Sequence, residues 1–310
     1  MGKDRGKTAV ILLAFGGADS VENVEEFIKN IFKGRPVPPA LIEDAKRRYR
    51  LIGGSSPLLK ITEAQAKALE ELLDKKEGRY PVFVGMLNWH PFIKDTIKEI
   101  GMAGIKEAAA IIMAPHSTPA STGGYKKAVG EALKETGSLL KVEFLENWHT
   151  HPLYIDAIME KLNEALQRFP SREDVLTVFS AHSLPIEALK NDPYVEKIEE
   201  TIREIVARVP LDWRLGYQSR GQSKGRHGEW LGPSVEDVIK EAKATGKKGV
   251  LVLPVGFISD HVETLYDIDI LFKETARAQG LDFQRAASLN TSERFIEMLS
   301  AIVLKTRTHL

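Results

Sequence analysis

The 310-residue sequence contains no cysteine. This absence excludes disulfides, thiolate zinc sites, cysteine-held iron–sulfur clusters and a cysteine nucleophile. Any metal must therefore be held by histidine, carboxylate or other oxygen ligands. An excess of one charge is also missing, because 43 Lys and Arg residues balance 43 Asp and Glu residues. Bulk electrostatics therefore favours neither nucleic acid nor an anionic membrane surface as a partner.

Long hydrophobic runs are missing too, since none approaches the roughly 20 residues that span a bilayer. The first apolar run, at 8–15, follows a charged segment and leads into Gly16–Ser20, a turn and helix cap without a small-residue cleavage site. This pattern predicts a buried first strand rather than a signal peptide. We therefore expect a cytoplasmic protein without a transmembrane segment, and peripheral membrane contact stays open.

Short apolar runs alternate with segments of helical period, which is typical of βα units around a parallel sheet. Several runs are apolar almost throughout, so helices should cover both faces of each sheet. The fold class is therefore α/β, with two lobes of one topology, each a four-stranded parallel sheet flanked by helices. The predicted strands are 8–15, 82–87, 108–114, 142–145, 175–179, 214–218, 250–255 and 283–287.

The boundary between the lobes is predicted near 146–152, giving lobes at 1–148 and 149–310. Helix caps are expected at Ser20 and Ser234, and a capping box at Thr62 with Gln65. The last helix, about 292–305, is apolar over much of its circumference. We expect it to pack between layers or lobes as part of the second lobe.

Polar residues at the carboxyl ends of the strands are the best candidates for chemistry, because open parallel sheets bind ligands there. His182 follows the strand at 175–179. Carboxylates crowd the segment 260–269, where Glu263 and Asp267 are i, i+4 neighbours on one face of a helix. Like charges so placed are unfavourable unless they share a proton or a cation. An acidic first helical turn would explain only the earliest of them.

An imidazole that faces a carboxylate pair suits a divalent metal of the iron, cobalt, nickel or zinc group, or general acid–base catalysis. His182 can face Glu263 only if the strands that precede them are neighbours. A dinucleotide site at Gly16-Gly17 is disfavoured, because the full glycine fingerprint is absent and Asp19 would repel a pyrophosphate. The glycine pair is explained by a tight turn, and the basic residues at 224–227 by a solvated loop.

Six motifs stand in order over nearly the whole chain: 53–58 (GGSSPL), 115–117 (PHS), 179–185 (FSAHSLP), 218–220 (QSR), 230–233 (WLGP) and 254–267 (PVGFISDHVETLYD). Together they resemble the ferrochelatases. The resemblance implies a class II chelatase fold of two Rossmann-like lobes with an interdomain cleft, and insertion of ferrous iron into a porphyrin in haem biosynthesis.

The resemblance implies His182 as the catalytic histidine and Glu263 as its carboxylate partner, together forming the iron site. Asp267 would continue an acidic path along the same helix. Ferrous iron is then a substrate, and neither a prosthetic group nor an iron–sulfur cluster is expected. The partners are porphyrin and ferrous iron, not nucleic acid. Positions that look like porphyrin contacts are Phe15, Ser56, Tyr125 and Trp230.

Two positions depart from the family pattern. Leu271 stands where many relatives have a further acidic residue, which would shorten a carboxylate relay. Phe15 stands where relatives resembling the coproporphyrin-using group have tyrosine, although Ser56, Tyr125 and the Arg35 region resemble that group. We expect protoporphyrin IX as the substrate, with coproporphyrin III as the alternative. A cobalt or nickel chelatase for another tetrapyrrole, and a non-catalytic tetrapyrrole carrier, are the competing functions.

Overall fold

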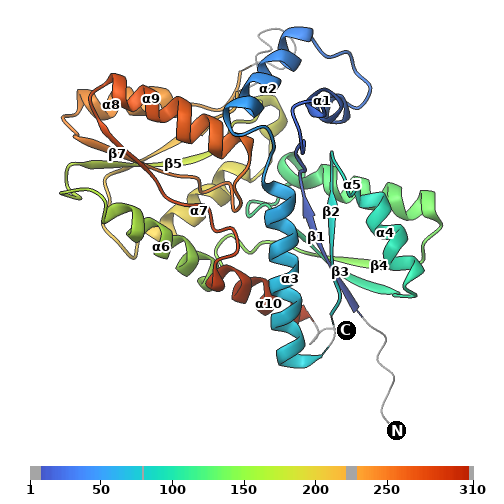
Figure 1. Ribbon diagram of the computed structural model, residues 1–310. Coiled ribbons are helices and arrows are strands. Elements are labelled where there is room, and N and C mark those ends of the chain that lie inside the picture. Colours follow the sequence, from blue (N-terminus) through green and yellow to red (C-terminus); the bar gives the residue numbers. More distant parts are fainter. Residues whose placement is uncertain (1–7, 79, 221–228, 307–310) are drawn as a thin grey trace. The chain divides into compact units, whose positions relative to one another are not determined.

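The computed structural model describes residues 8–78, 80–220 and 229–306, so the basic residues at 224–227 lie outside the described part. The chain forms two compact units (Figure 1). Unit 1 comprises Met1–Trp148 and Asn290–Leu310, and unit 2 comprises His149–Leu289. No helix among the described residues is both long and apolar enough to cross a membrane.

Each unit is built on one four-stranded parallel sheet, which confirms the predicted fold class. The order is β2-β1-β3-β4 in unit 1 and β6-β5-β7-β8 in unit 2, so the two sheets share one topology. All eight predicted strands are present, with ends shifted by a few residues at most. They are β1 (Thr8–Ala14), β2 (Val82–Met86), β3 (Glu107–Ile112), β4 (Lys141–Leu145), β5 (Val175–His182), β6 (Trp213–Gln218), β7 (Gly249–Leu253) and β8 (Asp282–Arg285).

Helices cover both faces of the sheet in unit 1. On one face, α4 (Ile93–Met102) and α5 (Pro119–Thr136) pack on alternate residues of β1 and β3, and this cluster is almost fully buried. Contacts on β1 and β2 also come from α3 (Leu58–Glu77). The alternation follows from the period of two in a strand, which sends successive apolar side chains to opposite faces.

The sheet of unit 2 is sandwiched in the same way. The helix α8 (Val235–Ala244), the π-helix η2 (Glu263–Phe272) and α9 (Lys273–Ala278) bury their apolar residues against β5 and β7. Figure 1 shows α8 and α9 on one side of this sheet and α6 and α7 on the other. The remaining helices are α1 (Val24–Phe32), α2 (Pro39–Leu51), α6 (Pro152–Leu166), η1 (Ile186–Leu189), α7 (Tyr194–Val206) and α10 (Glu293–Thr306).

The C-terminal helix corrects the predicted domain assignment, because residues 290–310 group with unit 1 rather than with the second lobe. Helix α10 packs against α3. Its Phe295 ring lies 6.2 Å from the ring of Trp148, and both side chains are buried. The apolar circumference seen in the sequence is therefore buried within unit 1, to which the chain returns after β8.

The helix caps were predicted with mixed success. Ser234 caps α8 as expected, since its hydroxyl accepts a hydrogen bond from the Asp237 amide at 3.2 Å. The capping box at Thr62 is wrong, because α3 begins one turn earlier, at Leu58. The Thr62 hydroxyl instead donates to the Leu58 carbonyl at 2.8 Å, the usual bond of a threonine inside a helix. Ser20 also lies outside its helix, which begins at Val24 after Asn23.

The Gly16-Gly17 turn after β1 is explained by backbone conformation and close packing. Gly16 has a φ of +92°, and a Cβ there would lie 3.0 Å from the backbone nitrogen of Trp89. A Cβ on Gly17 would lie 2.7 Å from the Cβ of Ser56. Both positions therefore need glycine without any bound ligand, as the turn interpretation predicted.

We predict that Gly16→Ala destabilises the protein by at least about 1–2 kcal/mol, because alanine must adopt a left-handed conformation in contact with Trp89. Gly130→Ala is the matched control, since Gly130 lies inside α5 with open space around it. The control should stabilise by about 0.5–1 kcal/mol. Denaturant unfolding measures both changes, and equal midpoints for Gly16→Ala and the wild type would contradict the proposed strain.

Candidate active site

The candidate site lies where the strand order of unit 2 changes direction. In the order β6-β5-β7-β8 the chain leaves β5 toward β6 on one side and returns to β7 on the other. Parallel sheets bind ligands at such switch points, outside the carboxyl ends of the strands. His182 is the last residue of β5, and Glu263 follows β7. Because β5 and β7 pair directly, the neighbour relation that these two residues require is met.

The structure brings His182 and Glu263 together, with Nε2 of the histidine 3.6 Å from Oε1 of the glutamate. Nδ1 of His182 lies 2.6 Å from the Ser183 carbonyl. A carbonyl only accepts hydrogen bonds, so Nδ1 carries a proton, and in the neutral imidazole Nε2 is then the nitrogen with a lone pair, on the side of Glu263. The side chains are 35% and 28% exposed, so the pair is accessible to a small ion.

A second imidazole, that of His261, approaches the other side of the same carboxylate. Its Nε2 lies 4.0 Å from Oε2 of Glu263, and its Nδ1 donates to the Ser259 carbonyl at 3.0 Å. Burial lowers the pKa of His261, although the Glu263 carboxylate acts in the opposite direction. Oε2 of Glu263 is buried without a hydrogen-bond partner among the described residues. Such an atom favours a proton, a cation or a water at this position.

A hydrogen bond from a side chain of β6 to the backbone of Glu263 holds the start of η2. Gln218, the last residue of β6, donates from Nε2 to the Glu263 carbonyl at 3.1 Å, and its own amide oxygen accepts from the Ser180 hydroxyl. The buried side chains of Ser180 and Gln218 therefore connect two strand ends to the residue that carries the carboxylate. Sequence reasoning named neither as a site residue, although both lie in or beside quoted motifs.

Asp267 is buried and lies beyond Glu263 in the same helix. The Ser219 hydroxyl donates to its Oδ2 at 2.8 Å, and Ser219 adopts a left-handed φ of +59°. Non-glycine residues in this conformation are uncommon and cluster at functional sites. Sequence reasoning placed Ser219 at a strand end but did not predict this bond.

The helix that carries the carboxylates is a π-helix rather than an α-helix, with hydrogen bonds from residue i to i+5. Its wider turn still keeps Glu263 and Asp267, four residues apart, on nearly the same side. Leu271 packs against the hydrophobic core of unit 2. The position at which the family resemblance implies an acidic residue therefore holds a partly buried side chain that packs on the core.

The crowded carboxylates have a cation that the sequence did not reveal. Arg285, at the end of β8, contacts Asp260 through Nη1 at 2.8 Å and Asp269 through Nε at 2.8 Å. Burial acts to lower the pKa of Arg285, but the two aspartates raise it above its usual value. Within the segment 260–269, Asp260 and Asp269 are therefore engaged by Arg285, whereas Glu263 and Asp267 have other surroundings. The sequence signal that could have identified this cation is the basic residue at the end of β8, the strand that pairs with β7.

The four predicted porphyrin contacts have different surroundings. Phe15 directly follows β1, with 45% of its surface exposed, whereas Ser56 and Tyr125 are buried in unit 1. Trp230, in unit 2, forms a β-bridge with Pro185, three residues after His182. The Nε1 atom of Trp230 is buried without a hydrogen-bond partner in the described part of the chain.

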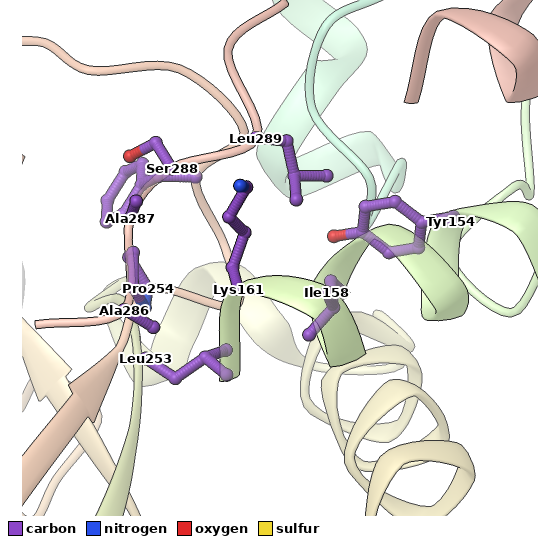
Figure 2. Close-up of a pocket in the computed structure, with 10 residues that line it drawn as sticks. Tyr154, Ile158, Lys161, Leu253, Pro254, Ala286, Ala287, Ser288 and Leu289 are labelled. Atoms are coloured by element: carbon purple, nitrogen blue, oxygen red, sulfur yellow. The ribbon is translucent and has the colours of Figure 1, made fainter. Parts of the chain in front are cut away.

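A cluster of three or more metal ligands would be a stronger candidate site, and so would a pocket lined by other polar side chains. Within residues 8–78, 80–220 and 229–306, no group of three or more His, Asp or Glu side chains could hold a metal ion. A pocket of about 20 Å³ in unit 2 is lined by α6 and the segments after β7 and β8, including Tyr154, Pro254 and Ser288 (Figure 2). It lacks both His182 and Glu263 and is smaller than typical ligand pockets.

Comparison with known proteins agrees with the motifs and their order. The family model described as Ferrochelatase matches residues 7–307. The chain belongs to the ferrochelatase family. This confirms the resemblance, and the ferrochelatase-family chain is an enzyme that inserts iron into a porphyrin.

The relatives of this ferrochelatase-family chain match it over nearly their whole length. It is 38% identical to "Ferrochelatase" of Herpetosiphon aurantiacus, covering 96% of this chain and 98% of the relative. It is 35% identical to "Coproporphyrin III ferrochelatase" of Oceanobacillus iheyensis, covering 97% of each. The solved structure of SirB from Bacillus subtilis with Fe3+ is 11% identical, with a TM-score of 0.59 and coverage of 97% and 95%. At that identity SirB shows the chelatase fold alone.

We predict different effects for two substitutions at Ser219. Both Ser219→Gly and Ser219→Ala remove the hydroxyl bond to Asp267, but only alanine remains strained at φ +59°. Ser219→Ala should therefore be less stable than Ser219→Gly by about 1 kcal/mol, while the two share the same change in insertion rate. Denaturant unfolding and steady-state assays measure the two quantities. Equal stability, or a rate change in only one variant, would contradict the assigned role of the hydroxyl.

Proposed function

We propose that His182 and Glu263 bind the ferrous iron that this enzyme inserts into its porphyrin. The observation that carries the proposal is the unbonded approach of Nε2 to Oε1, 3.6 Å apart at the switch point of the sheet. A neutral imidazole nitrogen and a carboxylate oxygen are suitable ligands for iron and neighbouring divalent metals.

The separation fits one ion held by both side chains. Imidazole nitrogen and carboxylate oxygen bind zinc, a comparable divalent ion, at about 2.1 Å. Two such bonds across a gap of 3.6 Å subtend an angle of about 120° at the ion. The angle is open enough for solvent or porphyrin nitrogens to complete the coordination. The hydrogen bond from Nδ1 to Ser183 keeps Nε2 available throughout.

Insertion exchanges ferrous iron for two pyrrole protons, so the site must accept protons as it releases the metal. Glu263 and the Nε2 atom of His182 hold the ion first and can accept a proton once it has left. Asp267, four residues along η2 and hydrogen-bonded to Ser219, offers the next acceptor. With Leu271 in the core, the acidic path on this helix ends at Asp267.

The side chains available to the macrocycle favour protoporphyrin IX over coproporphyrin III. Phe15 is an exposed apolar ring, which suits vinyl groups. Arg35, a candidate partner for an additional propionate, donates from Nε to the Phe32 carbonyl at 3.0 Å and lies over the Phe32 ring. The Tyr125 hydroxyl is buried, which raises its pKa and keeps it protonated. Ser56 and Trp230 complete the proposed contacts.

Ferrous iron is a substrate in this proposal, and the enzyme needs no resident prosthetic group. The absence of cysteine leaves no thiolate for an iron–sulfur cluster. The absence of a nucleic-acid partner belongs to the same proposal, since the charges balance. So does a cytoplasmic location with at most peripheral membrane contact.

We predict that His182→Ala abolishes insertion while porphyrin affinity stays near normal, because the imidazole binds the metal rather than the macrocycle. Glu263→Gln should be nearly inactive, and Asp267→Asn should be slowed less because it lies one step from the ion. Anaerobic insertion assays with ferrous iron and porphyrin fluorescence titrations on the same samples measure both properties. Such losses would also exclude a non-catalytic carrier.

Glu274→Gln is the control for this series, because Glu274 is an exposed carboxylate on α9, directly after η2. It should insert iron at the wild-type rate. Insertion by His182→Ala within a few-fold of wild type would overturn the proposed iron site. A greater loss in Asp267→Asn than in Glu263→Gln would show that the order along η2 is wrong. Faster insertion of cobalt or nickel than of iron would favour another chelatase activity.

We predict that protoporphyrin IX has a higher kcat/KM than coproporphyrin III under identical detergent and iron conditions. The reason is the exposed apolar ring of Phe15, together with the hydrogen bond that holds Nε of Arg35 to the Phe32 carbonyl. Phe15→Tyr should shift the ratio toward coproporphyrin by adding a hydrogen-bonding group. A coproporphyrin advantage above about a hundredfold, or about 2.7 kcal/mol, would reverse the assignment.

A further inference from the structure

We propose that Arg285 is a positioning residue for iron insertion, which sets the Glu263 carboxylate relative to His182 by holding the polypeptide on both sides of Glu263. This inference rests on the proposed function of His182 and Glu263. Arg285 itself does not contact either side chain, and it acts through Asp260 and Asp269.

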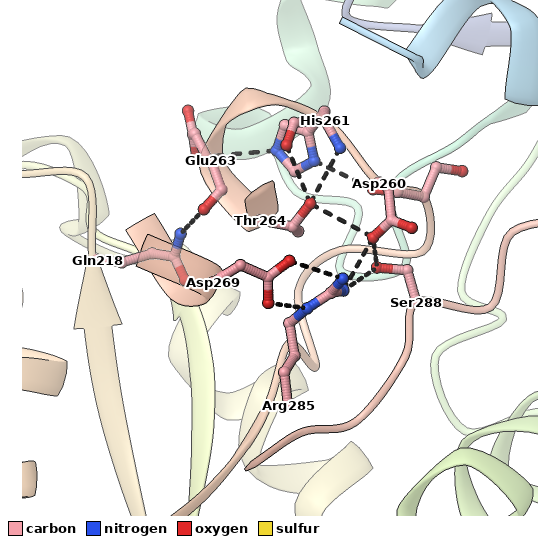
Figure 3. A network of polar contacts seen from close by, with 9 residues as sticks. Gln218, Asp260, His261, Glu263, Thr264, Asp269, Arg285 and Ser288 are labelled. Atoms are coloured by element: carbon pink, nitrogen blue, oxygen red, sulfur yellow. Dashed lines mark hydrogen bonds and ion pairs between the residues drawn. The ribbon is translucent and has the colours of Figure 1, made fainter. Parts of the chain in front are cut away.

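The guanidinium of Arg285 holds two carboxylates at once, as Figure 3 shows. Its Nε and Nη2 atoms donate to the two oxygens of Asp269 at 2.8 and 3.0 Å, a bidentate pair. Its Nη1 atom donates to Asp260 Oδ1 at 2.8 Å and lies 3.3 Å from the Ser288 hydroxyl. Ser288 also donates to Asp260 Oδ1 at 2.7 Å. Charge-assisted bonds of this kind are roughly twice as strong as neutral ones.

Burial makes this group of bonds more rigid than an ordinary surface ion pair. The side chains of Arg285, Asp260 and Asp269 are 14%, 19% and 36% exposed. Most exposed ion pairs contribute little because water screens them and their side chains are mobile. A planar guanidinium bound at several donors in a half-buried site has little freedom to move.

The two anchored aspartates flank the residue that binds the metal. Asp260 lies three residues before Glu263, and Asp269 lies six residues after it inside η2. Thr264 connects the two parts, because its hydroxyl accepts from the His261 amide at 3.0 Å and lies 3.5 Å from Asp260 Oδ1. A displacement of Asp260 would therefore move the first turn of η2, which carries Glu263.

The helix that Arg285 holds through Asp269 is a π-helix, which is an unusual element. Runs of i to i+5 hydrogen bonds are rare, usually a single turn, and occur frequently at functional sites. Here the π-helix spans ten residues, from Glu263 to Phe272. Arg285 ties one of its aspartates to β8, which pairs with β7 beside the site. The sheet thus supports the helix from both edge strands, through Gln218 at the end of β6 and Arg285 at the end of β8.

Arg285→Lys is the informative variant, because lysine keeps the charge but cannot bind Asp269 and Asp260 in the same fork geometry. We expect KM for ferrous iron to rise, or kcat to fall, by about 10- to 100-fold, the usual effect of removing a partner that orients a metal ligand. Porphyrin affinity should change by less than about twofold. Zinc insertion, assayed in air, should show the same loss.

If Arg285 only stabilised the fold, Arg285→Lys would give another result. The substitution would lower the concentration of active enzyme, and the molecules that fold would keep the wild-type KM for iron. Active-site titration with porphyrin therefore accompanies each assay. Asp269→Asn and Ser288→Ala provide milder removals of single contacts if Arg285→Lys does not fold, and both should raise KM for iron in the same direction. Unchanged KM and kcat in the folded variants would overturn the inference.

The control is Arg208→Lys, which alters another arginine–aspartate pair of unit 2. Arg208 Nη1 lies 2.5 Å from Asp156 Oδ1, at a more exposed position remote from η2. This variant should match the wild type in both metal and porphyrin parameters. A parallel change in Arg208→Lys would assign the effect to general loss of ion pairs and overturn the inference.

The Glu263→Gln background separates this inference from the proposed function. If Arg285 acts by placing the Glu263 carboxylate, Arg285→Lys should change the residual rate of Glu263→Gln by less than about twofold. An additive loss would overturn the positioning role. Full activity of Glu263→Gln itself would overturn the proposed function, whereas an inactive Glu263→Gln with a wild-type Arg285→Lys would overturn only the role of Arg285.

Discussion

The pairing of β5 with β7 is the constraint on which the candidate site depends. It places the end of the strand carrying His182 beside the end of the strand that leads to Glu263. These residues are 81 positions apart in the chain, yet Nε2 of His182 and Oε1 of Glu263 lie 3.6 Å apart. The parallel register and the switch in strand order produce this approach before any side-chain contact contributes. Local bonds to Ser183 and Gln218 then select the orientation of each group.

Charge is distributed along the segment 260–269 so that each carboxylate has a different role. Asp260 and Asp269 share an ion pair with Arg285, and Asp267 accepts a hydrogen bond from Ser219. Oε2 of Glu263 is buried without a hydrogen-bond partner among the described residues and faces His261 at 4.0 Å. A carboxylate that accepts few hydrogen bonds keeps more of its capacity for a proton or a cation. Structural and chemical carboxylates are therefore distinguished by their partners rather than by their spacing.

The strand count, the parallel sheets and the placing of His182 and Glu263 after strands could be predicted, because each depends on local pattern. That the two side chains face each other could not, since it depends on the pairing of β5 with β7. Apolar runs identify strands, and polar residues just after them mark the edge where ligands bind. Arg285 could not be assigned in the same way, since its partners are determined by the pairing of β8 with β7. The π-helix was missed because its sequence pattern also suits an α-helix. The C-terminal helix was placed in the wrong unit because an apolar helix surface does not identify what covers it.

A pair of protein ligands suits a metal that must leave again. Resident structural metals are usually enclosed by about four protein ligands, which satisfy the ion completely. Among the described residues, no cluster of three or more metal-binding side chains forms, and His182 with Glu263 supplies one nitrogen and one carboxylate. An ion held by two groups retains exchangeable positions, so porphyrin nitrogens can replace water before the protein bonds break. His261 lies on the other side of the carboxylate, with its Nε2 4.0 Å from Oε2 of Glu263, and burial lowers the pKa of its imidazole. A site that transfers a metal must hold the ion weakly and still keep its ligands in a fixed geometry. Residues that do not bind the ion must therefore hold the two ligand side chains in place.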